Sequence, residues 1–71
     1  MPLLHGIYLD QAFNEKYIIL SVNDGWVNVV WTPRDFDHEL SKGYANATFP
    51  IGAMSGDIYC GQATELVLSL L

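Results

Sequence analysis

The sequence predicts an α+β fold, a small antiparallel β-sheet of three to five strands with one or two short helices. Two runs of β-branched and aromatic residues flank an Asp-Gly pair near the middle of the chain, which is typical of a β-hairpin. A Thr-Pro pair followed by acidic residues comes next and is typical of a helix start. The 71 residues leave room for one domain, 1–71. The alternative is a small, mostly-β barrel in which the C-terminal segment is a strand.

The first strand is predicted over residues 4–9, where Ile7 and Leu9 alternate with Tyr8. Residues 11–16 are then the connection that leads into the hairpin.

The hairpin is predicted over residues 17–31, with Asp24 and Gly25 as a two-residue loop. This loop pairs Leu20 with Val29 and leaves one face wholly apolar, so we expect that face to be buried. A three-residue loop would mix polar residues into both faces and is disfavoured. The apolar face comprises Ile18, Leu20, Val22, Val27, Val29 and Trp31. The other face comprises Tyr17, Ile19, Ser21, Trp26, Asn28 and Val30.

A helix is predicted over residues 33–42. Thr32 can cap its first turn, and Pro33 suits the first helical position, where a missing N–H costs nothing. Phe36 and Leu40 lie four residues apart and form an apolar stripe on one side.

The C-terminal half is predicted to contain shorter elements. Residues 43–50 are expected to be loop, and residues 51–54 and 58–60 are short strand candidates around a Ser-Gly-Asp turn. The apolar residues of 63–71 fit both a helical and a strand period. Helix is favoured, because this segment is rich in good helix formers.

Charge narrows the classes of partner. Eight acidic residues against three basic ones give a net charge of -5. Direct binding to nucleic acid or to anionic membranes needs clustered Lys and Arg, so neither is expected. Another protein with a basic surface is a compatible partner. The N-terminal sequence lacks the pattern of a signal peptide, so we expect a cytoplasmic protein.

A chain of this size has difficulty in stabilising its core. It buries only about 60% of the surface that its unfolded form exposes. Cys60 is the only cysteine, and the histidines have no zinc-site spacing, so neither a disulfide, a metal nor a cofactor is expected to help. Apolar residues make up 51% of the chain, more than one small core can hide. A homodimer that covers the surplus is therefore expected.

Two clusters allow a chemical interpretation beside a simpler one. On the predicted helix, Asp35, His38 and Glu39 share one face and could hold a metal ion or act as an acid–base pair. The simpler interpretation is a solvated helix face. Cys60 could act as a nucleophile, but cysteine in an apolar stretch is more often a small buried hydrophobe.

The residues favoured for partner binding are the mixed face of the hairpin and the acidic helix. Aromatic side chains with a polar tip are common anchors of protein interfaces, and spaced carboxylates can imitate nucleic acid. The predicted set is Tyr17, Ile19, Trp26, Val30, Asp35, Asp37 and Glu39.

The function predicted from these features is non-catalytic binding to another protein. One form of it is a phage- or mobile-element-type inhibitor of a host protein, since such inhibitors are often small and acidic. A structural homo-oligomer is the second possibility. The third is a small enzyme or metal-binding domain that uses the acidic cluster at residues 35–39.

Overall fold

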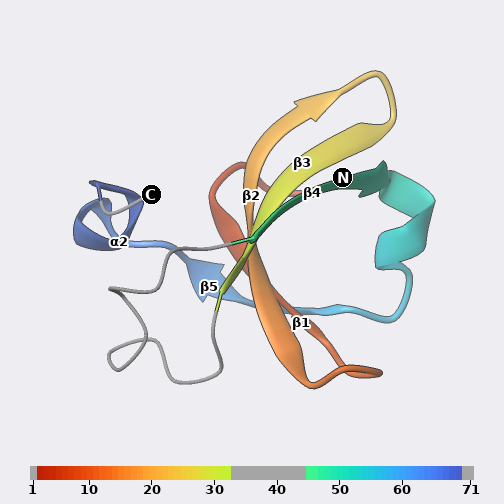
Figure 1. The fold of residues 1–71 in the computed structure, drawn as a ribbon, viewed down its shortest axis with the longest axis horizontal. Helices are drawn as coiled ribbons and strands as arrows, with labels where there is room; N and C mark the ends of the chain where they lie inside the picture. The colour runs from red at the N-terminus through yellow and green to blue at the C-terminus, as the bar shows by residue number, and fades with distance from the viewer. Residues whose placement is uncertain (1, 33–44, 70–71) are drawn as a thin grey trace.

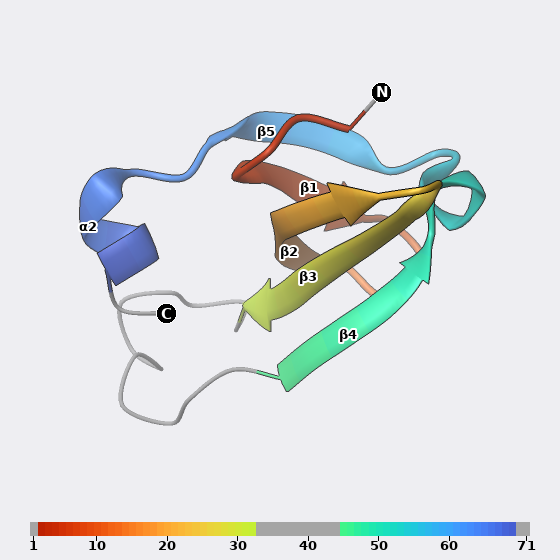
Figure 2. The same cartoon turned by 90° about the horizontal axis from the view of Figure 1, so that it is seen from above.

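The computed structural model describes residues 2–32 and 45–69. Over these residues the chain is mostly β, with five strands in one antiparallel sheet of order β4-β3-β2-β1-β5 (Figure 1). Figure 2 shows the strands in this order, from β5 at the top to β4 at the bottom. The strands are β1 (Gly6–Asp10), β2 (Glu15–Asn23), β3 (Trp26–Thr32), β4 (Ala45–Pro50) and β5 (Ile58–Gln62).

Two short helical elements accompany the described strands. The 3₁₀ turn η2 (Ile51–Met54) precedes β5, and the helix α2 (Glu65–Ser69) follows it. The helix expected in the C-terminal segment is thus confirmed over α2, whose Val67 N–H donates to the Thr64 hydroxyl oxygen at 3.2 Å. The sheet is open, with β4 and β5 at separate edges, so the alternative of a closed barrel with a C-terminal strand is wrong. The helix predicted over residues 33–42 lies outside the described residues.

The β2–β3 hairpin turns where the sequence predicts. Asp24 and Gly25 have φ values of 46° and 83°, the left-handed conformation that this tight turn needs. Asn23 faces Trp26 across the turn, also as predicted. Beyond it, a bulge between Ile19 and Ser21 shifts the pairing by one residue.

The bulge reverses the faces of the first half of β2. Val29 pairs with Ile19, so the predicted pairing with Leu20 is wrong. Side chains alternate along a strand, so one extra residue moves Tyr17 to the side of the sheet that holds the core and moves Ile18 to the other side. We call these sides the core face (Tyr17, Ile19, Val27, Val29) and the second face (Ile18, Ser21, Asn28, Val30).

The core lies against the core face. Val27 and Val29 are fully buried, as predicted, whereas Trp31 is only half-buried at the margin of the cluster. Further contacts come from β4, which contributes Ala47 and Phe49. The loop prediction for residues 43–50 is therefore wrong over β4, which pairs with β3 along its whole length.

The segment after β4 folds back over the core. Residues 51–54, predicted as a strand, form the 3₁₀ turn η2 instead. The Ile51 N–H donates to the Gly25 carbonyl oxygen at 2.8 Å, which fastens this turn to the hairpin loop. Ile51 and Met54 thereby pack on the core cluster.

The strands β1 and β5 lie close to the positions predicted from the sequence. β1 begins two residues later than predicted, at Gly6, and β5 contains the predicted strand 58–60. A Cβ at Gly6 would lie 2.9 Å from the Leu3 carbonyl oxygen and 3.1 Å from the Tyr59 ring, so only glycine fits there. In the described part of the chain, no helix is long and apolar enough to cross a membrane.

Candidate functional site

The four hairpin residues predicted for partner binding do not form one exposed face. Tyr17 and Ile19 are fully buried on the core face, and Val30 is nearly buried on the second face. Trp26 alone is accessible, with 52% of its surface exposed. The bulge at Leu20 explains this result, because it turns Tyr17 and Ile19 inward.

The acidic residues predicted for partner binding belong to a segment that the structure does not describe. Asp35, Asp37 and Glu39 are outside the described residues, as is His38. Within 2–32 and 45–69, no group of three or more His, Cys, Asp or Glu side chains is placed to hold a metal ion. Cys60 is exposed on β5, contrary to the expectation that it is buried.

Trp26 lies beside a row of hydrogen-bonded, uncharged side chains on the second face. The Asn28 amide donates to the Ser21 hydroxyl oxygen at 2.8 Å and accepts from the Thr48 hydroxyl at 2.6 Å. Asn28 follows Trp26 by two residues in β3, so both side chains project from the same face. We call these four residues (Ser21, Trp26, Asn28 and Thr48) the Trp26 patch.

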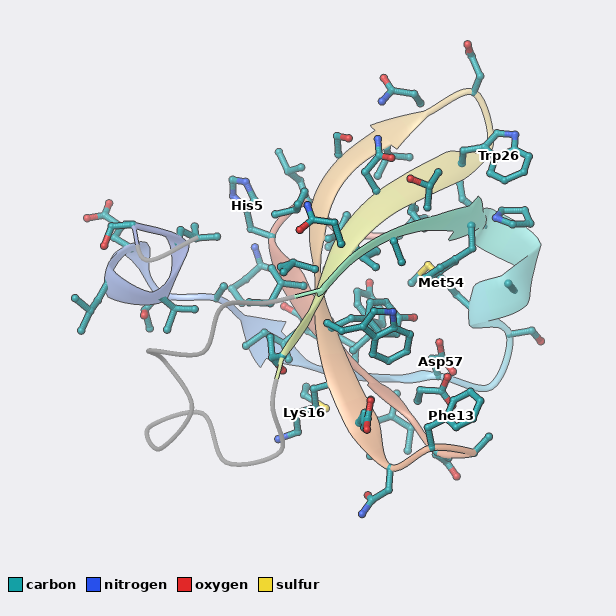
Figure 3. All side chains as sticks on the ribbon, in the orientation of Figure 1. His5, Phe13, Lys16, Trp26, Met54 and Asp57 are labelled. Carbon is teal, nitrogen blue, oxygen red and sulfur yellow. The ribbon has the colours of Figure 1, made fainter. Side chains whose placement is uncertain are left out.

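The chemistry of the Trp26 patch suits recognition rather than catalysis. An indole offers a large rigid apolar surface and one N–H donor, and the neighbouring amide and hydroxyl groups can exchange hydrogen bonds with a partner. Figure 3 shows Trp26 near the tip of the hairpin, away from Asp57 and Phe13. The patch contains no ionisable side chain and therefore no general acid or base.

A second site opens from the core face. A hollow of about 180 Å³ lies between the sheet and the segment that carries η2. Its walls combine three aromatic rings with two carboxylates and one methyl group. The lining residues are Asp10, Tyr17, Trp31, Phe49, Ala53 and Asp57. We call this hollow the Asp10–Asp57 pocket.

Tyr17 connects the pocket to the core. Its ring centroid is 5.0 Å from that of Trp31 and 5.4 Å from that of Phe49, with both pairs edge-on. Its hydroxyl donates a hydrogen bond to an Asp57 carboxylate oxygen. Burial, then this hydrogen bond and the nearby negative charges of Asp57 and Asp10, hold the pKa of Tyr17 far above its ordinary value. Tyr17 therefore stays a neutral donor and adds no negative charge to the pocket.

Backbone contacts hold the two carboxylates in place. Asp10 ends β1, and one of its oxygens accepts the Ala12 N–H at 2.9 Å. The Gln11 amide donates to the Gly56 carbonyl oxygen at 3.3 Å, which links this turn to the turn before Asp57. Both carboxylates thus belong to turns that are fastened to each other.

The sequence offers little sign that Asp10 and Asp57 belong to one site. Each resembles an ordinary turn residue, and the two are far apart in the chain. They line one hollow because β1 and β5 pair antiparallel, with Leu9 opposite Ile58, and Asp10 follows Leu9 while Asp57 directly precedes β5. The pairing of β1 with β5 is the information needed to place the two residues in one site, and a single sequence does not reveal it.

Comparison with models of known protein families, with curated proteins and with solved structures finds no match to this chain.

Proposed function

We propose that this chain is a non-catalytic protein-binding module that contacts its partner through the Trp26 patch. The observation that carries the proposal is the exposure of Trp26, at 52%, beside hydrogen-bonding groups that bear no charge. Exposed tryptophans are frequent hot spots of protein interfaces, particularly where polar groups surround them. A phage- or mobile-element-type inhibitor of a host protein is one form that this role would take.

Affinity capture from a native lysate tests this proposal when paired variants are used. Trp26→Ala removes the exposed indole, whereas Phe13→Ala removes an aromatic ring that is more exposed, at 70%, and lies at a distant place (Figure 3). We expect wild type and Phe13→Ala to retain the same protein and Trp26→Ala to lose it. Capture of the same protein by the wild type and both variants, or by none of the three, would contradict the proposal. Circular dichroism checks that each variant is folded.

Self-association is a second candidate function, favoured by the exposed apolar side chains of β5. Ile58 is 47% exposed and Tyr59 44%, and β5 is an edge of the described sheet. Edge strands offer unpaired backbone groups to another strand, so a second copy could extend the sheet there. The sequence predicts a homodimer that uses the mixed face of the hairpin or the leucines of residues 66–71, whereas this interface would use β5.

Sedimentation velocity at micromolar concentration tests the homodimer. If β5 forms the interface, wild type should sediment as a dimer, and Ile58→Lys should sediment as a monomer because a charge opposes edge pairing. Leu66→Lys is the matched control, since Leu66 is 71% exposed on α2. A monomeric wild type would exclude this function and leave β5 free.

The acidic cluster at residues 35–39 supports two further proposals that the described residues do not bear on. One is imitation of nucleic acid by Asp35, Asp37 and Glu39, and the other is a metal or catalytic site. The first would act on a partner with a basic surface, and the second through a bound metal ion or an acid–base pair.

A further inference from the structure

Asp10 and Asp57 bring two negative charges to one hollow. Asp10 ends β1 and Asp57 directly precedes β5, next to the Leu9–Ile58 pair, and both line the same hollow. Like charges that line one hollow repel each other and cost stability. None of the lining residues is basic, so the lining supplies hydrogen bonds to these carboxylates but no opposite charge. The arrangement favours a positive charge at the mouth of the pocket.

The remaining walls are aromatic, and this determines which kind of cation fits. Trp31 and Phe49 line the hollow beside the buried Tyr17 ring. The face of an aromatic ring attracts an ammonium or guanidinium group, and apolar walls favour a methylene stem over water. A bare divalent metal suits the site poorly, because calcium takes about six to eight oxygen ligands.

The size of the hollow limits the ligand further. At about 180 Å³ it holds the volume of roughly six water molecules. That space admits one charged group with a short stem.

We propose that the Asp10–Asp57 pocket binds an organic cation carried on a short apolar stem. This chemistry is shared by a lysine or arginine side chain of a partner and by a free alkylamine or alkylguanidine. The site goes beyond the protein-binding role proposed for the Trp26 patch, and either can fail without the other.

Fluorescence of Trp31 reports directly on this pocket. The chain has two tryptophans, so Trp26→Phe leaves Trp31 as the only one. We expect n-butylammonium and n-butylguanidinium to change its emission saturably, and the neutral alcohol 1-butanol to have no saturable effect. A blocked Gly-Lys-Gly tripeptide tests the side-chain source. Binding of the tripeptide assigns the site to a partner protein, and binding of the small cations alone assigns it to free amines.

Charge variants test whether the carboxylates hold the cation. Asp10→Asn and Asp57→Asn keep an oxygen that can accept the Ala12 N–H and the Tyr17 hydroxyl, so both should fold. Each should weaken cation binding at least about tenfold, since a charge-assisted hydrogen bond is lost.

The matched control is Asp24→Asn, which removes the same charge from the exposed hairpin turn. Its φ of 46° is one that asparagine also adopts readily. Unchanged binding in this variant supports the proposal. The proposal is overturned if the Trp31 signal does not saturate with any cation, if 1-butanol gives the same response, or if Asp24→Asn weakens binding as much as the pocket variants.

Discussion

At the residue scale, Tyr17 joins the core to the Asp10–Asp57 pocket. Its ring stacks on Tyr8 with centroids 5.9 Å apart and contacts Trp31 and Phe49 edge-on, while its hydroxyl donates to Asp57. The buried ring contributes apolar area, and its polar end is satisfied by a carboxylate at the margin of the core. The sequence pattern assigns Tyr17 to a partner surface, and the structure shows that it is internal.

The raised pKa of Tyr17 predicts how stability depends on alkaline pH. An unfolded tyrosine ionises near pH 10, whereas folded Tyr17 keeps its proton. The stabilising contribution is therefore complete below about pH 10 and is lost as pH rises above it, by up to about 1.4 kcal/mol per pH unit.

Urea unfolding of wild type and Tyr17→Phe between about pH 8 and pH 11 measures this effect, because only the wild type has this ionisation. The wild-type free energy of unfolding should fall more steeply above about pH 10 than that of the variant. Parallel curves would show that Tyr17 ionises as readily in the folded chain as in the unfolded one.

Gly6 is a second residue whose identity the packing dictates. An added methyl group would meet the Leu3 carbonyl oxygen at 2.9 Å and the Tyr59 ring at 3.1 Å. Backbone must shift to admit it, so Gly6→Ala should lower the free energy of unfolding by about 1–3 kcal/mol. Gly52→Ala is the control, because a methyl group added there would have nothing within 4 Å. Equal effects of the two substitutions in urea unfolding would contradict this packing.

At the scale of single elements, the bulge in β2 decides which side chains are buried. Residues 17–20 are all apolar, so the sequence pattern is compatible with either face pointing inward. The alternation rule predicts an unbroken ladder and therefore selects Leu20 for the core. Tertiary packing instead places Ile19 in the core, together with Tyr17, whose hydroxyl donates a hydrogen bond to Asp57.

Alanine substitutions at adjacent positions test the bulge. Ile19 is fully buried and Leu20 is partly exposed. Ile19→Ala should therefore lower the free energy of unfolding by about 2–5 kcal/mol, as expected for a core truncation. Leu20→Ala should cost about 1 kcal/mol, because less apolar area is lost. The reverse order in chemical denaturation would favour the regular hairpin.

The elements found from the sequence are those with local signals. The Asp24-Gly25 turn, β5 and α2 each carry turn residues or a residue preference that acts within a few positions. β4 has the sequence Ala-Asn-Ala-Thr-Phe-Pro, which has little preference for a strand by itself. It becomes one because it pairs with β3 and inserts Phe49 into the core, and such pairing is not visible in a local pattern.

At the scale of the whole molecule, the described surface divides into regions of different chemistry. The Trp26 patch combines an apolar ring with uncharged polar groups. The Asp10–Asp57 pocket carries negative charge, and the edge strand β5 exposes apolar side chains. The sequence predicts surplus apolar surface and a negative charge, and both are consistent with these regions. It does not predict their places, because the bulge and the β1–β5 pairing determine them.

The Trp26 patch is the region on which the proposed protein-binding function depends. An isolated tryptophan on a surface is not unusual in itself, since much of any protein surface is apolar. Its position beside three hydrogen-bonding side chains is what distinguishes it, because hot-spot aromatics act where surrounding groups exclude water.

Titration of the captured partner, by calorimetry, is the measurement that tests this function most directly. Trp26→Ala should weaken binding by about 2 kcal/mol or more, as expected for a tryptophan at the centre of an interface. Phe13→Ala should change the binding free energy by less than about 0.5 kcal/mol, because Phe13 lies in a distant turn. Equal affinities of wild type and Trp26→Ala would contradict the assignment of the Trp26 patch as the binding surface.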